Sequence, residues 1–93
     1  MILSFRHKGL RRFYEKGIAR DLPAQQVPRI RRILTAIDEA SAPGELGLFP
    51  GWRLRRLRGD MKGFWSLTVT GNWRIIFRFE DGDAHDLNFV DYH

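Results

Sequence analysis

The residues best suited to chemistry follow Trp52 and form a basic stretch and a terminal tripeptide, Asp91-Tyr92-His93. Between Arg53 and Lys62 the chain carries five cations and one anion, which is +4 of the formal net charge of +5. Such a concentrated positive field attracts phosphates and releases their counterions. The sequence therefore predicts a polyanionic partner, nucleic acid before others, with a solvated basic surface as the alternative.

The length and composition restrict the class of protein. The 93 residues fit a single domain, 1–93, whose one core buries about 60–65% of the unfolded surface. The chain has no cysteine, which excludes disulfides and thiolate metal sites. The acidic run 80–83 indicates a turn, because it is too short for a calcium-binding EF-hand loop. We expect no metal and no cofactor.

Membrane and export signals are also missing from the sequence. No apolar run approaches the roughly 18 residues of a membrane span. The first residues, MILSFRHKGLRR, lack the long apolar centre of a signal peptide. We therefore expect a cytoplasmic protein with no membrane contact.

The chemical residues need a scaffold, and its first part is predicted to be a short strand and an amphipathic helix. Residues 2–5 form a short apolar run typical of a strand. From Lys8 to Lys16 apolar residues recur at intervals of three and four, and Gly17 is a helix stop. A lone histidine such as His7, just before this helix, is more often structural than catalytic, and we interpret it as structural.

A second helix with a basic outer face is expected up to about Ala40. Asp21-Leu22-Pro23 is a start signal, because aspartate caps helices and proline is tolerated in the first turn. Pro28 would clash with the preceding turn inside a helix, so we expect regular helix from about 23–25 or a kink there. One apolar stripe should cover a core while the arginines of 29–32 face outward.

After Gly51 the period of the apolar residues changes from 3.6 to 2, which predicts three half-buried strands. Gly71-Asn72 and Asp81-Gly82 invite two-residue hairpin loops. Such loops would set polar positions opposite apolar ones, whereas three-residue loops, 70–72 and 81–83, avoid this conflict. The predicted pairs are Val69 with Trp73, Leu67 with Ile75, Phe79 with His85, Phe77 with Leu87 and Ile75 with Phe89.

This register predicts which residues share the open face of the sheet. Arg74 should face Val90, with Tyr92 as its diagonal neighbour at roughly 7–8 Å between Cα atoms. Arg78 should face Asp86 in a surface ion pair of little energetic weight. The terminal tripeptide would therefore return beside an arginine on an exposed sheet face.

Three segments resemble a known family: the opening SFRHKGL, the stretch GDMKGFWSLTVTGNWRIIFRFEDGDAHDLN and the closing DYH. In this order they resemble the HigB toxins of the RelE-like, or plasmid maintenance killer, family over almost the full length. The resemblance implies an α+β domain with two N-terminal helices packed on one face of a small mixed, largely antiparallel sheet. It also implies the toxin of a type II toxin–antitoxin system, a ribosome-dependent endoribonuclease that cuts mRNA and inhibits translation.

The same resemblance implies partners and site residues. The partners would be a HigA-like helix-turn-helix antitoxin, the ribosomal A site and mRNA, with operator DNA bound only through the antitoxin complex. By position, the catalytic set falls on Arg58, Arg74, Asp91, Tyr92 and His93, and the other cations are RNA- or phosphate-binding: Arg53, Arg55, Arg56 and Lys62. One position departs, because Arg55 stands where well-known relatives have a histidine.

The arginine at this position constrains the reaction, because arginine stays charged and cannot act as a base. Metal-independent RNA cleavage needs a base for the 2′-OH, cations on the phosphate and a donor to the leaving 5′ oxygen, and it yields a 2′,3′-cyclic phosphate. Arg58 and Arg74 suit the phosphate. Proton transfer then falls to Asp91 and His93, in either order, while Tyr92 stacks on or positions a base.

Two other functions are compatible with the same basic surface. One is a non-catalytic RNA- or ribosome-binding module, and the other is a basic protein-interaction domain that binds an acidic partner. The terminal tripeptide beside Arg74 favours the nuclease over the non-catalytic binding module, because binding alone needs no groups that transfer protons.

Overall fold

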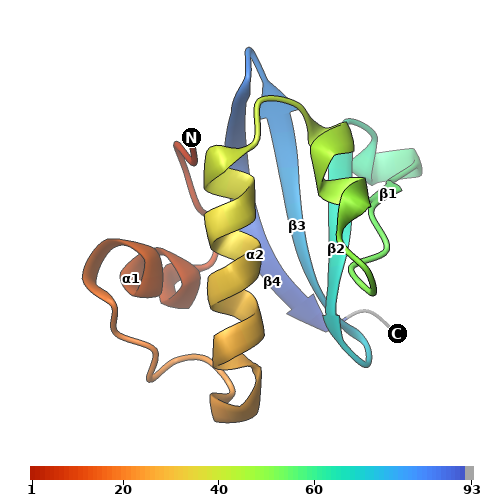
Figure 1. The fold of residues 1–93 in the computed structure, drawn as a ribbon. Helices are drawn as coiled ribbons and strands as arrows, with labels where there is room; N and C mark the ends of the chain where they lie inside the picture. The colour runs from red at the N-terminus through yellow and green to blue at the C-terminus, as the bar shows by residue number, and fades with distance from the viewer. Residues whose placement is uncertain (92–93) are drawn as a thin grey trace.

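The computed structural model describes residues 1–91 and shows an α+β domain, as the sequence predicts (Figure 1). The predicted site residues Tyr92 and His93 lie outside the described residues. Within residues 1–91 the elements are α1 (Lys8–Lys16), η1 (Ala24–Gln26), α2 (Val27–Glu39), η2 (Pro43–Leu48), β1 (Arg55–Arg56), η3 (Gly59–Met61), β2 (Phe64–Thr70), β3 (Trp73–Glu80) and β4 (Asp83–Asp91), where η marks short 3-10 helices.

The strands form one antiparallel sheet in the order β1-β2-β3-β4. The strand expected at residues 2–5 is reduced to two parallel bridges along the outer side of β4, Ile2 with Ala84 and Phe5 with Leu87. Backbone hydrogen bonds accompany them, such as that from Leu3 N to Ala84 O at 2.8 Å. These bridges supply the parallel component of the predicted mixed sheet.

The helices cover one face of the sheet, with α2 running roughly along the strands in front of β4 and α1 beside it (Figure 1). The predicted apolar stripe of α2 is buried at Ile30, Ile33, Leu34 and Ile37. From the sheet, Leu67, Val69, Ile75, Phe77 and Leu87 are fully buried in the same core. Because apolar burial is the main stabilising term, this packing decides which face of the sheet stays free for a site.

The ends of α1 agree with the sequence prediction. The helix stops at Gly17, whose φ of 71° is left-handed and whose N–H donates to Phe13 O. At the start, His7 is the N-cap, and its Nδ1 accepts a hydrogen bond from Leu10 N at 3.1 Å. The interpretation of His7 as a structural residue is therefore confirmed.

The start of α2 corrects the prediction. The chain forms the 3-10 helix η1 over Ala24–Gln26, and regular α-helix begins only at Val27 rather than at 23–25. Pro28 consequently lies in the first turn, where its missing N–H leaves no hydrogen bond unmade. The end of the helix at Glu39, with Ala40 as its cap, is as predicted.

Both hairpins close on two-residue loops, so the predicted three-residue loops are wrong. Thr70 pairs with Trp73 across Gly71-Asn72, and Glu80 pairs with Asp83 across Asp81-Gly82. The predicted pairs Val69–Trp73 and Phe79–His85 are replaced by Thr70–Trp73 and Phe79–Ala84, and Phe77–Leu87 falls at an irregularity of the ladder.

Two β-bulges resolve the conflict that had argued against short loops. In β2 the extra residue is Val69, which stays in the core, and in β4 the extra residue lies near Asp86, whose φ is 56°. A bulge adds one residue to one strand and so restores the alternation of faces. Beyond the bulges, Leu67–Ile75, Arg74–Val90 and Ile75–Phe89 pair as predicted.

One carboxylate joins three segments on the helix side of the molecule. Asp38 Oδ1 accepts hydrogen bonds from Ile2 N at 2.9 Å and from the Tyr14 hydroxyl at 2.7 Å. The bond to Asp38 raises the pKa of Tyr14 to about 12. The start of the chain and α1 are thereby fixed to the last turn of α2.

Candidate functional site

Arg74 lies near the hairpin end of β3, on the sheet face that the helices leave open. In register it stands between Thr68 of β2 and Val90 of β4. The pairing with Val90 is the one predicted from face parity. Thr68 N also donates to Trp52 O at 2.7 Å. The segment just before β1, which leads to Arg53, therefore lies beside β2 at the level of Arg74.

The guanidinium of Arg74 is oriented by the backbone of its own hairpin. Its Nη1 donates to Gly71 O at 2.7 Å and to Trp73 O at 3.2 Å. Both acceptors are neutral carbonyls, which fix the direction of the side chain while leaving its positive charge intact. The half-buried Arg74 is therefore preorganised to bind an anion on the open face.

Arg78, four residues along β3 on the same face, has a different environment. Its Nε donates to Asp86 Oδ2 at 2.9 Å and its Nη1 to Glu80 Oε2 at 2.8 Å. The hydrogen bond with Arg78 lowers the pKa of Asp86, and its bonds to Asp86 and Glu80 raise the pKa of Arg78. The predicted ion pair with Asp86 is confirmed, although the residue opposite Arg78 in register is His85.

A polar hollow of about 390 Å³ adjoins Arg74. Its lining comes from α2, from the segment before β1 and from the hairpin of β2 and β3: Arg29, Gly51, Arg53, Thr68, Val69, Thr70, Gly71 and Arg74. The predicted cations Arg53 and Arg74 thus meet at one place. Arg29 was expected only on the outer face of its helix, and sequence periodicity gives no sign that it reaches this hollow.

Three of the remaining predicted cations gather at a second hollow of about 370 Å³, lined by Arg55, Arg56, Leu57 and Arg58. The fourth, Lys62, is the exposed C-cap of η3 and does not line this hollow. Arg55 stands opposite Ser66 on the open face, whereas Arg56 stands opposite Trp65 with its guanidinium 5.2 Å from the ring centroid. Arg58 is the exposed N-cap of η3. The structure therefore brings Arg58 together with Arg55 and Arg56, and places Arg74 at the other hollow.

The end of the chain approaches this face through β4. Val90 pairs with Arg74, and the exposed Asp91 pairs with Trp73. Tyr92 and His93 follow directly but lie outside the described residues. The last described residue of the predicted catalytic set is therefore one register position from Arg74.

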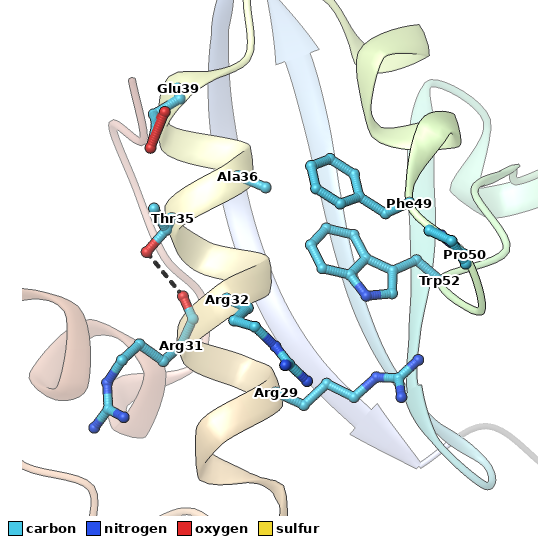
Figure 2. Close-up of a pocket in the computed structure, with 9 residues that line it drawn as sticks. All are labelled: Arg29, Arg31, Arg32, Thr35, Ala36, Glu39, Phe49, Pro50 and Trp52. Atoms are coloured by element: carbon cyan, nitrogen blue, oxygen red, sulfur yellow. Dashed lines mark hydrogen bonds between the residues drawn. The ribbon is translucent and has the colours of Figure 1, made fainter.

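A groove of about 740 Å³, larger than either of these hollows, lies on the helix side and not at the predicted site (Figure 2). Figure 2 shows Phe49 and Trp52 directed toward Ala36 of α2. The two rings stack with centroids 4.1 Å apart and planes 12° apart. Arg29 lines both this groove and the hollow at Arg74. Sequence reasoning missed this groove, because the loop that forms it has no periodic pattern.

The described residues contain neither a metal-binding cluster nor a membrane-spanning helix. Among residues 1–91, no group of three or more His, Asp or Glu side chains lies close enough to hold a metal ion. No helix within the same residues is long and apolar enough to cross a membrane.

Sequence comparisons show close relatives over the full chain. A family model described as the RelE-like toxin of type II toxin–antitoxin system HigB matches residues 3–93. The Endoribonuclease HigB of Proteus vulgaris is 52% identical over 93 residues and covers 100% of both chains. Toxin HigB-1 of Vibrio cholerae is 36% identical over 85 residues, 90% of each chain.

Solved structures share the fold at low sequence identity. A YoeB–YefM toxin–antitoxin complex from Staphylococcus aureus superposes with a TM-score of 0.62 at 15% identity, covering 100% of this chain and 98% of that one. A YoeB/ParE toxin from Agrobacterium tumefaciens gives a TM-score of 0.58 at 18% identity, covering 97% and 99%. At such identities the likeness concerns the fold alone.

Proposed function

Because the chain belongs to the RelE-like HigB toxins of type II toxin–antitoxin systems, we propose that it is a metal-independent endoribonuclease that cuts mRNA on the ribosome. The observation that carries the proposal is the position of Arg74, oriented by two carbonyls on the open basic face of the sheet. The 52% identical relative named an endoribonuclease supports the same activity.

The proposed reaction begins with attack of the ribose 2′ oxygen on the adjacent phosphorus. The bond from O2′ to phosphorus forms and the bond from phosphorus to O5′ breaks, which leaves a 2′,3′-cyclic phosphate and a 5′-OH. A base takes the 2′-OH proton, and an acid supplies a proton to the departing O5′. Arg74 and Arg58 stabilise the additional negative charge on the phosphate oxygens.

Proton transfer is assigned to Asp91 and His93, and Tyr92 stacks against a base of the message. Arg55 occupies the position of the family's histidine and stands opposite Ser66 on the open face. Because arginine remains charged, Arg55 contributes a phosphate contact and no proton transfer. Arg53, Arg56 and Lys62 add further contacts to the RNA backbone.

The proposed protein partner is a HigA-like antitoxin. Its acidic residues would meet the basic faces of α1 and α2, because complementary charges steer and select a partner. The antitoxin would also link the toxin to operator DNA, which the chain itself has no need to contact. The relatives of known structure include toxin–antitoxin complexes, which supports a protein partner of this kind.

Induced expression in growing bacteria tests the proposal. We expect growth arrest and messages cut inside their reading frames, with 2′,3′-cyclic phosphate ends. With purified ribosomes, cleavage should persist after chelation and readdition of only the magnesium that the ribosome needs. Bound but uncut messages would support the non-catalytic RNA binder instead, and normal growth without a recovered partner would contradict the toxin function.

A further inference from the structure

The hollow beside Arg74 brings together three arginines from three parts of the chain. Arg29 comes from α2, Arg53 from the segment before β1 and Arg74 from β3. Thr68 and Thr70 add hydroxyl-bearing side chains, and none of the lining residues in the described chain is acidic. Like charges that line one hollow repel each other, and an anion between them would offset the repulsion.

Arg29 has a buried donor without an acceptor. Its Nη2 donates to Gly51 O at 3.2 Å, whereas its buried Nε has no hydrogen-bond partner within residues 1–91. Buried polar groups are normally paired, so this donor is available to an acceptor, either from a ligand or from the equally unpaired Oε1 of Gln26. Figure 2 shows Arg29 extending from α2 past Trp52. Gly51 permits this path, since a Cβ there would lie 3.2 Å from Arg29 Nη2.

Arg53 has a backbone conformation that its side chain disfavours. Its φ is 49°, in the left-handed region that residues other than glycine seldom adopt. Strained residues of this kind concentrate at functional sites, where the surrounding structure holds them in place. The strain at Arg53 is therefore a second observation, independent of Arg29, that points to a ligand in the hollow.

We propose that Arg29 and Arg53, beside Arg74, form a subsite for the RNA phosphate next to the one that is cut. The proposal rests on the proposed function, in which Arg74 contacts the scissile phosphate. Guanidinium groups bind phosphate oxygens through paired N–H donors, and threonine hydroxyls add further donors. A hollow of about 390 Å³ accommodates a phosphodiester with part of its sugar. The subsite would fix the register of the strand relative to the reacting 2′-OH.

Binding of an uncleavable RNA tests the subsite without requiring catalysis. The probe is a 2′-O-methyl RNA of about ten nucleotides, and its affinity is measured by fluorescence anisotropy over a range of salt concentrations. Arg29→Gln should weaken binding about 10-fold and reduce the salt slope by about 0.7, the share of one phosphate contact on a single strand. Arg32→Gln removes the same charge from the same helix outside the hollow, and should change affinity less than about 2-fold.

A second variant separates lost contact from lost folding. Arg53→Gly removes the cation and relieves the left-handed strain, so its Tm should equal or exceed that of the parent chain. RNA affinity should nevertheless fall as it does for Arg29→Gln. Parental affinity in both Arg29→Gln and Arg53→Gly would overturn the proposal.

A probe with one uncharged methylphosphonate linkage locates the phosphate. The uncharged linkage is placed at each position of the strand in turn, and at one position it should weaken binding to the parent chain. At that position it should not weaken binding to Arg29→Gln, because the linkage and the substitution remove the same contact. Inorganic phosphate that binds as tightly as the RNA would assign the hollow to free phosphate and overturn the RNA subsite.

The same measurements separate the subsite from the nuclease. If the parent chain cuts no natural message but Arg29→Gln binds RNA more weakly than the parent, the nuclease is refuted and the subsite is kept. If the parent chain cuts messages normally and Arg29→Gln keeps the RNA affinity of the parent, the subsite alone is refuted. Loss of antitoxin binding with unchanged RNA affinity would assign Arg29 to the protein partner and also refute the subsite.

Discussion

Arg74 and Arg78 show how two identical residues on one strand acquire different roles. Arg78 bonds two carboxylates, Asp86 and Glu80, and its charge is used in holding β3 to β4. Arg74 bonds the carbonyls of Gly71 and Trp73, so its direction is fixed and its charge remains available. The difference lies in the acceptors, which the identity of the residue itself does not reveal.

Arg74→Ala should reduce cleavage about 10²–10³-fold, because a preoriented donor to the developing phosphate charge is lost. Single-turnover cleavage of a ribosome-bound message measures the effect. Arg78→Ala is the matched control on the same face, and should lower Tm while changing the cleavage rate of the folded fraction only a few-fold. Parental cleavage by Arg74→Ala would exclude Arg74 from the reaction.

His93→Ala should reduce cleavage about 10²–10⁴-fold if this side chain transfers a proton. Binding to the ribosome should persist, since the cations that contact RNA are unchanged. The cleavage rate of Asp91→Asn, compared with that of His93→Ala, shows which of the two side chains transfers the proton. Should His93→Ala alone cut normally, proton transfer would belong to Asp91, and normal cutting by the double variant would exclude this mechanism.

At the scale of the element, the N-cap of α1 links helix stability to pH. Burial lowers the pKa of His7 from its ordinary value of 6.5, with the charge of Asp21 as a smaller opposing influence. Only the neutral imidazole can accept the bond from Leu10 N at Nδ1. A depressed histidine pKa means that the cap is fully present above about pH 6.5 and is lost as the pH falls below it.

His7→Asn should therefore flatten the loss of stability between pH 7 and pH 5. Asparagine is a good N-cap that does not titrate in this range. Urea unfolding at pH 7 and pH 5 gives the change in the free energy of unfolding between the two pH values. This change is compared, and not the stability itself, because His7→Asn also removes the ring contact with Phe89. The same pH dependence in both proteins would show that the cap does not carry it.

The hairpin of β2 and β3 depends on the left-handed residue Gly71, whose φ is 54°. Gly71→Ala should cost about 1–2 kcal/mol in the free energy of unfolding, since nothing lies within 4 Å of the new Cβ and only backbone strain opposes it. Gly44→Ala is the control, because Gly44 is equally open without a positive φ. Denaturant unfolding should show a neutral or stabilising effect there. Equal losses in both variants would refute the explanation.

The same hairpin shows what the sequence could and could not predict. Alternation assigned Leu67, Ile75 and Phe89 to the core face and Arg74 to the open face, and the structure confirms this. The loops were wrong because a bulge such as that at Val69 has no signature in a regular apolar pattern. The apparent conflict in parity was itself the sign of an extra residue.

The sequence predicts the residue types of the candidate site and the place of Arg74, but not the contribution of Arg29. The concentration of arginine after Trp52 and the place of Arg74 follow from composition and register. The contribution of Arg29 does not, because helical periodicity states which face is polar but not how far a side chain reaches. Only the packing of α2 against the segment at Gly51 brings Arg29 to the hollow.

At the scale of the molecule, basic residues occupy two sides. One side is the open sheet face with Arg53, Arg55 and Arg74, and the other is the helix layer, where Arg31 and Arg32 are exposed. The two sides are separated by the core. We infer that RNA and the antitoxin use different sets of cations.

Charge reversal on the helix layer tests this separation. Arg31→Glu combined with Arg32→Glu should weaken the complex with a coexpressed HigA-like antitoxin at least about 10-fold, because like charges oppose each other at the interface. RNA cleavage should remain within a few-fold of the parent. Arg55→Glu is the control on the opposite side and should show the reverse pattern. Equal antitoxin binding in all three proteins would refute the assignment of sides.

The segment at the start of the chain has a consequence for aggregation. A strand with free N–H and C=O groups at a sheet edge is a template on which other chains can stack. Here residues 2–5 lie along the outer side of β4 through the bridges at Ile2 and Phe5. The opposite edge is β1, only Arg55–Arg56 long and charged at both positions. Both edges are thereby protected against the addition of further strands, which disfavours edge-to-edge aggregation of the folded chain.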